Sequence, residues 1–134
     1  MLIMKFADST AHEIHASTTV YPSGSATVRS RMEVHMAEDA MTLANFEALM
    51  TDAAKTETLR IIETRTDTDE NGEAVETLVR DNAYSAYTYV SRVGKERVDV
   101  VDHTTGATTS ETHLVVVLEQ LTYTEQQLTK LGLL

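Results

Sequence analysis

The chain has 134 residues, a mass of 14.8 kDa and a formal charge of −10, with 11 Lys and Arg against 21 Asp and Glu. This length predicts one domain, residues 1–134, and a hydrophobic content of 42% excludes a disordered acidic tail. The absence of cysteine excludes disulfides, thiolate metal sites and thiol nucleophiles. The acidic balance argues against direct nucleic-acid binding, which needs a basic surface. We expect no membrane span, because no apolar run approaches the required length of about 18 residues.

The first part of the chain predicts strands. Met1–Phe6 is the first strand, a short one follows at 12–16, and a loop is expected at 21–24. Ser25–Met36 is the clearest strand, because apolar and polar residues alternate along it. One parity holds Ala26, Val28, Met32, Val34 and Met36, and the other holds Thr27, Arg29, Arg31, Glu33 and His35. We expect the first set to be buried and the second to face water.

A helix is predicted over 42–54, where apolar residues recur three and four positions apart. These residues are Leu43, Phe46, Leu49, Met50 and Ala53. Asp39 or Thr42 can cap the first turn, because either side-chain oxygen accepts a hydrogen bond from an unpaired amide.

After this helix the pattern returns to strands, at 57–65, 73–80, 83–90, 97–102 and 112–121. Asn71-Gly72 favours a tight hairpin between the first two. Val115–Leu118 predicts a strand buried on both faces, and 124–131 predicts a short helix. The predicted fold class is therefore mainly β (α+β): a small antiparallel barrel or sandwich of seven or eight strands, with one covering helix and a short C-terminal helix.

The segment from Asp67 to Glu73 is the most specific local match to a metal site. Asp67, Asp69, Asn71 and Glu73 place oxygen ligands at alternate positions around Gly72, as in the first half of a calcium loop. The twelfth position of such a loop would be Leu78, where a bidentate carboxylate is needed. The flanks also predict strands rather than helices. We therefore expect a charged hairpin tip, with these four residues as weak metal candidates.

The five histidines predict no metal site. His12 and His15 are three apart, which places them on opposite faces of a strand. His35, His103 and His113 belong to different segments, so we expect scattered surface histidines. Ser23-Gly24-Ser25 lacks the strand and helix of a hydrolase nucleophile turn, and the five glycines form no phosphate-binding motif. We expect no enzymatic activity and no cofactor.

Tyrosines gather toward the C-terminal half. Tyr84, Tyr87 and Tyr89 lie in one predicted strand, where Tyr87 and Tyr89 share a face, and Tyr123 follows near the C-terminus. Such side chains can form a contact surface or line a core with their hydroxyls at its edge. The pattern does not separate these two interpretations.

The order of elements resembles that of a known group of proteins. The residues that carry the likeness are Met1–Thr10, the helix at Leu43–Met50, the exit at Thr58–Ile62, Tyr84–Val90 and the ending Val115–Leu128. Within this ending, LEQLTYTEQQL is the closest part. The chain resembles small virion structural proteins encoded in the tail-gene regions of phages and prophages of Gram-positive bacteria. The layout is similar over most of the chain, the residues only at the two ends and the helix, and this chain stops soon after Leu128.

The resemblance implies a non-enzymatic building block of a tail tube, baseplate or tail-completion ring. Such a subunit would assemble with copies of itself or dock to other tail proteins, and would be located in the virion and, before assembly, in the host cytoplasm. The strand Ser25–Met36 and the tyrosine strand are the expected contact edges, with candidate interface residues Arg29, Arg31, Glu33, Tyr87, Tyr89 and Tyr123. The alternatives are a small β-barrel module that binds a small ligand or divalent cation at 67–73, and a small hydrolase or isomerase with a barrel pocket.

Overall fold

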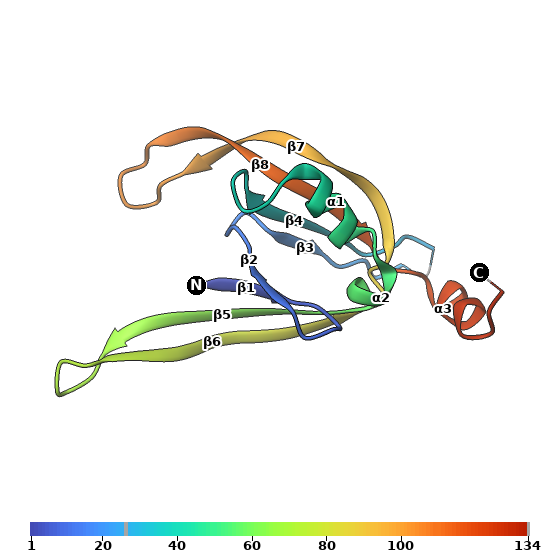
Figure 1. Cartoon of the computed structure of the whole chain (residues 1–134), viewed down its shortest axis with the longest axis horizontal. Helices are drawn as coiled ribbons and strands as arrows, with labels where there is room; N and C mark the ends of the chain where they lie inside the picture. Colours follow the sequence, from blue (N-terminus) through green and yellow to red (C-terminus); the bar gives the residue numbers. More distant parts are fainter. Residues whose placement is uncertain (26, 134) are drawn as a thin grey trace.

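A computed structural model describes residues 1–25 and 27–133. Within these residues eight strands and three helices follow one another along the chain (Figure 1). They are β1 (Leu2–Lys5), β2 (Ala11–Glu13), β3 (Thr19–Tyr21), β4 (Arg31–Ala37), α1 (Leu43–Met50), α2 (Ala53–Thr56), β5 (Thr58–Thr68), β6 (Ala74–Ser85), β7 (Tyr89–Val101), β8 (Thr108–Glu119) and α3 (Tyr123–Lys130).

The strands form two antiparallel four-stranded sheets. Sheet A has the order β2-β1-β5-β6, and sheet B has the order β3-β4-β8-β7. The two sheets face each other and stay open at their edges, so the arrangement is a sandwich rather than a closed barrel (Figure 1). The predicted mainly-β class is confirmed, and of the two predicted architectures the structure has the sandwich.

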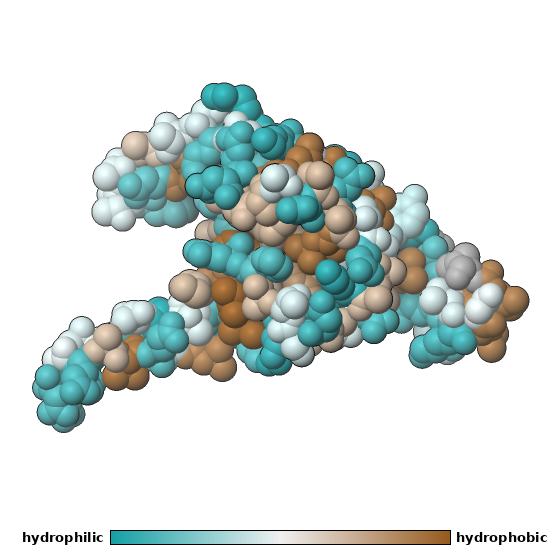
Figure 2. All heavy atoms as spheres, viewed as in Figure 1, coloured by the Kyte–Doolittle hydropathy of each residue, from teal (hydrophilic) through white to brown (hydrophobic). Residues whose placement is uncertain are grey.

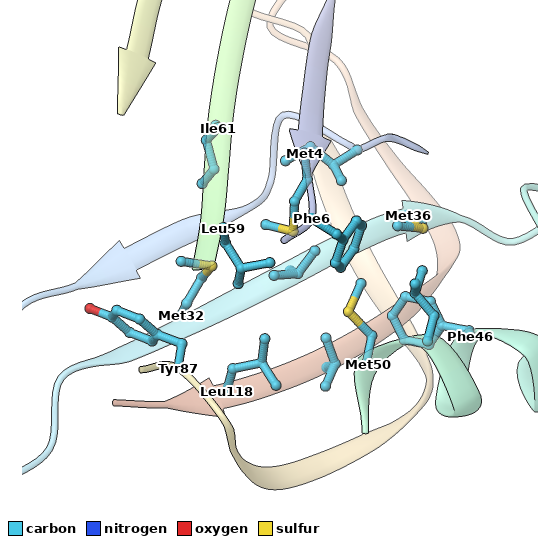
Figure 3. Packing of buried hydrophobic residues seen from close by; sticks show 14 of the residues in the cluster. Met4, Phe6, Met32, Met36, Phe46, Met50, Leu59, Ile61, Tyr87 and Leu118 are labelled. Carbon is cyan, nitrogen blue, oxygen red and sulfur yellow. The ribbon is translucent and has the colours of Figure 1, made fainter. Parts of the chain in front are cut away.

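One hydrophobic core lies between the sheets (Figure 3). Sheet A contributes Met4, Phe6, Leu59 and Ile61; sheet B contributes Met32, Val34, Met36, Leu114, Val116 and Leu118; α1 contributes Phe46, Leu49 and Met50. The alternation predicted for β4 holds for its three apolar residues, which are fully buried. Val115–Leu118 is buried on both faces, as predicted.

The predicted helix at 42–54 is two short helices. Thr42 caps α1 by accepting a hydrogen bond from the Asn45 amide at 3.2 Å, as predicted. The helix ends at Thr51, and Asp52 starts α2 because its carboxylate accepts from the Ala54 amide at 3.1 Å. The apolar spacing predicted the buried face of α1, which packs against β7 and β8, but not this second cap.

The prediction of one strand over Ser25–Met36 is wrong in its first half. β4 begins at Arg31, Val28 is 61% exposed, and Ala26 lies outside the described residues. Pairing sets this limit, because Arg31 is the first β4 residue with a partner on β8. The predicted loop at 21–24 begins one residue late, since Tyr21 still belongs to β3 and pairs with Arg31.

The prediction of one strand over 83–90 is also wrong. β6 ends at Ser85, and the chain reverses at Ala86, whose φ is 65°, before β7 starts at Tyr89. The Ala86 amide donates to Glu57 O and its carbonyl accepts from the Leu121 amide, which holds the turn in place. The reversal therefore separates tyrosines that the sequence placed on one strand.

The helix predicted at 124–131 is confirmed as α3. Thr122 and Glu125 form a capping box, in which each side chain accepts from the backbone amide of the other residue. None of the helices among the described residues is long and apolar enough to cross a membrane.

Candidate functional site

Two hairpin arms extend beyond the body of the sandwich (Figure 1). The pairing of β1 with β5 stops at Glu63, and the pairing of β4 with β8 stops at His113. Beyond these points each hairpin continues without a neighbouring strand. We call residues 64–79 the β5–β6 arm and residues 97–112 the β7–β8 arm.

Neither arm contributes to the hydrophobic core. Every residue of 64–79 and 97–112 is described, and none of them is buried. Figure 2 shows open space between the two arms. Their exposed apolar residues include Val75, Leu78, Val79 and Val101. An isolated two-stranded hairpin is only marginally stable in water, so arms of this kind gain most from a partner that packs on them.

The hairpin tip at Asp67–Glu73 uses its carboxylates within the turn. Asp69 Oδ1 accepts from the amides of Asn71 at 2.9 Å and Glu73 at 2.8 Å. Asp67 Oδ2 accepts from Arg65 Nε at 2.9 Å and from Thr77 Oγ1 at 3.2 Å. These contacts describe a stapled turn, in which the Arg65 guanidinium holds the pKa of Asp67 below its usual value.

Arg29 and Arg31, predicted as interface residues, make contacts within the chain. Arg29 donates two hydrogen bonds to the Glu125 carboxylate, at 3.0 and 2.7 Å, and its guanidinium lies 4.2 Å from the Tyr89 ring centre. The Arg31 guanidinium lies 4.5 Å from the Tyr21 ring centre. The Arg29 hydrogen bonds, with the Thr122 amide, lower the pKa of Glu125 to about 2. Arg29 therefore ties α3 to the start of β7.

The structure separates the predicted tyrosine surface. Tyr87 is buried in the core, and burial raises the pKa of its hydroxyl. Tyr89 starts β7 and is exposed, so Tyr87 and Tyr89 do not share one face as predicted. Tyr123, at the start of α3, is also exposed. Of this group only Tyr89 and Tyr123 remain accessible to a partner.

The prediction of scattered surface histidines is wrong for three of the five. His15, His35 and His113 form one group, which we call the histidine cluster. The ring centres of His113 lie 4.3 Å from His15 and 5.2 Å from His35. His35 and His113 are buried. Ala37 pairs directly with His113 across the sheet.

Three elements bring these rings together. His113 stands on β8, His35 on the adjacent β4, and His15 on the segment that crosses from sheet A to sheet B. The His15 amide donates to His35 O at 2.7 Å, which fixes the crossover against β4. His35 and His113 lie on the face of sheet B opposite the core residues, because β4 and β8 alternate.

Two carboxylates meet the cluster. Glu33 Oε1 lies 2.9 Å from His35 Nε2, and His35 Nδ1 lies 2.9 Å from His113 Nδ1. Glu111 Oε1 lies 3.8 Å from His113 Nε2. Burial lowers the pKa of His113, and the rings of His15 and His35 lower it further, so His113 is neutral at pH 7. Glu33, predicted as an interface residue, instead serves this group.

A cleft of about 820 Å³ opens between the sheets beside the cluster. Its lining includes Leu2 and Glu63 from sheet A, Ala37 from sheet B, and Glu13 and His15 from the crossover. His15 therefore belongs both to the cleft wall and to the cluster, which gives small solutes a route to it.

A signal in the sequence marks the cluster, although the residue spacing alone does not. The pattern Glu-x-His occurs three times, at Glu13-Ile14-His15, Glu33-Val34-His35 and Glu111-Thr112-His113. On a strand this spacing places a carboxylate and an imidazole on one face. His12 and His103, which lack the pattern, are outside the cluster. Only the topology shows that the three patterns converge.

Comparison with protein-family models, with curated proteins and with solved structures found no match. We therefore argue function from the arms and the histidine cluster.

Proposed function

We propose that this chain is a non-enzymatic structural protein that assembles with copies of itself through the edges of β6 and β7. The observation that carries the proposal is the pair of arms, which extend beyond the body without joining its core. Ordering a residue costs about 1–2 kcal/mol of conformational entropy. Arms that bury nothing within the chain recover this cost when a neighbouring molecule packs on them.

The free sheet edges support a backbone-mediated contact. β6 ends sheet A with 12 residues and β7 ends sheet B with 13. An edge strand presents a row of unpaired amide and carbonyl groups, which is a template for pairing with another strand. Because the two edges are nearly equal in length, one can cover the other along its whole extent.

Charge favours the pairing of unlike edges. β7 carries Arg92, Lys95 and Arg97 against Glu96 and Asp99, so it is net basic in an acidic chain. β6 carries Glu76 and Asp81 against Arg80, so it is net acidic. Pairing β6 of one copy with β7 of the next brings opposite net charges together, whereas pairing like edges does not.

Such a contact uses two different surfaces and is therefore heterologous. Heterologous contacts generate rings when the rotation closes and filaments when it does not. The resemblance to small phage and prophage tail proteins suits this geometry, and we propose a tail or baseplate ring in the virion as the assembly. Tyr89 lies at the start of the β7 edge and is the accessible candidate nearest to this contact.

The test combines size-exclusion chromatography and light scattering over a wide range of protein concentrations. The wild-type chain forms oligomers whose mass rises with concentration. Val75→Lys/Leu78→Lys places two charges on exposed positions of β6 and reduces this association. The control Val28→Lys/Leu131→Lys adds the same charge at exposed apolar positions outside both arms and leaves association unchanged. A wild-type chain that stays monomeric at every concentration contradicts the proposal.

A further inference from the structure

We propose that His15, Glu111 and His113 form a binding site for a transition-metal dication of the zinc type. Among the described residues, this is the set of His and carboxylate side chains whose ligand atoms all lie within 4.8 Å of one another. The site is separate from the edges of β6 and β7 and does not depend on the assembly proposed above.

The unpartnered nitrogen of His113 is the observation that points to a cation. His113 is 1% exposed, and its Nε2 has no hydrogen-bond partner among the described residues. Buried polar atoms in folded proteins nearly always have a partner, so an exception requires an explanation. The nearest charged atom is Glu111 Oε1, at 3.8 Å, which is beyond hydrogen-bonding distance.

The hydrogen-bond chain decides the tautomer of this ring. Glu33 can only accept, so His35 carries its proton on Nε2 and points it at Glu33. His35 Nδ1 is then a bare acceptor, and His113 must donate to it from Nδ1. The remaining nitrogen of neutral His113, Nε2, is a lone pair. The opposite assignment would direct the His35 Nε2 lone pair at the Glu33 carboxylate.

A lone pair that faces a carboxylate is unfavourable unless a cation lies between them. His113 Nε2 and Glu111 both present electron pairs to the same space. Glu96, which pairs with His113 across the sheet, is already bound by Arg92 Nε at 2.7 Å. Glu111 therefore remains the free carboxylate of this group, and a dication would satisfy both ligands.

The Glu33–His35–His113 chain is also a typical outer arrangement of a metal site. A ligating histidine almost always donates its second ring N–H to an acceptor, which fixes the tautomer and ring orientation. Here that acceptor is His35, itself held by Glu33. The same contacts that leave His113 Nε2 bare also hold the ring in place for coordination.

The distances require only a small closure. Three atoms at most 4.8 Å apart surround a point at most about 2.8 Å from each, against about 2.0–2.2 Å for zinc bound to nitrogen or oxygen. Glu111 is exposed and His15 is half-buried, so both side chains can move inward. His15 Nδ1 now accepts from the Ser17 amide at 3.0 Å, and coordination through Nε2 would transfer the ring proton to Nδ1 and break that bond.

The donor set selects the class of metal. Two imidazoles and one carboxylate suit zinc and the other first-row transition dications, whereas calcium and magnesium prefer oxygen ligands. Water can fill the remaining coordination position, because His15 also lines the cleft between the sheets. The metal would connect the crossover at His15 to the base of the β7–β8 arm at Glu111.

The test is a zinc titration of the tag-free, metal-depleted full chain at neutral pH by calorimetry. We expect one zinc per chain, a dissociation constant in the micromolar range or below, and a rise in Tm with zinc. His15→Ala and Glu111→Gln each weaken binding by about tenfold or more. His113 itself is left intact because it is buried, so its replacement would also change the packing.

Two matched controls separate coordination from general charge. His12→Ala removes a half-buried histidine from the same segment as His15, and Glu76→Gln neutralises an exposed arm carboxylate like that of Glu111. Both keep wild-type affinity. The proposal is overturned if zinc does not saturate a single site, if His15→Ala and Glu111→Gln bind as tightly as wild type, or if the controls weaken binding equally.

Discussion

Shortening the β5–β6 arm tests whether it is independent of the folded body. In the variant, Thr66–Glu76 is replaced by Asn-Gly, so that Arg65 and Thr77, which already pair directly, close a two-residue hairpin. The body of the sandwich, including every core residue, is left unchanged. We expect the free energy of unfolding to stay within about 1 kcal/mol of the wild type, for the following balance of terms.

The deleted segment holds one large apolar side chain, Val75, which is 43% exposed and contributes on the order of 1 kcal/mol through its covered half. The ion pair of Asp67 with Arg65 is exposed and contributes little. Against these losses, the variant no longer orders the deleted residues, and each costs about 1–2 kcal/mol that their ladder hydrogen bonds only offset. The terms nearly cancel.

Urea unfolding followed by circular dichroism measures the result. The variant should show a wild-type free energy of unfolding and a slightly smaller m-value, because less surface is exposed on unfolding. The same variant should fail to assemble in light scattering. A loss of more than about 2 kcal/mol, in a region where no core residue was removed, would show that the arm supports the body and would refute the reasoning.

Further predictions concern the core, α3 and the turn before β7. Phe46→Ala removes a fully buried side chain and should cost about 3–5 kcal/mol in urea unfolding. Because the pKa of Glu125 is lowered from 4.5 to about 2, its bond to Arg29 stabilises the docked α3 above pH 4.5, and this contribution is lost as pH falls toward 2. Arg29→Gln should return the Glu125 pKa toward 4.5 in an NMR titration and speed amide exchange in α3. Ala86→Gly should stabilise the chain by up to about 1 kcal/mol, since Ala86 has φ of 65°, and a lower Tm would contradict this reading of the turn.

Local rules predicted what depends on neighbouring residues in the chain. The alternation in β4, the apolar spacing of α1, the Thr42 cap and the apolar run of β8 are all encoded within a few residues. The pattern failed where pairing decides the outcome. Val28 continues the alternation of β4 but lies beyond the last residue paired with β8, so it is exposed.

The histidine cluster and the arms could not be predicted from spacing alone. His15 and His113 are far apart in the chain and meet only because β4 lies beside β8 and the crossover binds β4. The sequence placed His35 on the exposed face of its strand, whereas His113 and Glu33 enclose it. The arms arise because β5 and β8 outrun their partners, β1 and β4, which is a property of strand lengths across each sheet.

An intermolecular disulfide test addresses the central claim, that β6 of one copy pairs with β7 of another. The chain has no cysteine, so Val79→Cys near the middle of β6 and Lys95→Cys near the middle of β7 each introduce a single thiol. The two variants are made with different masses and oxidised separately and together. The account predicts a mixed disulfide dimer only in the mixture. The absence of that dimer, or equal cross-linking in each variant alone, would contradict it.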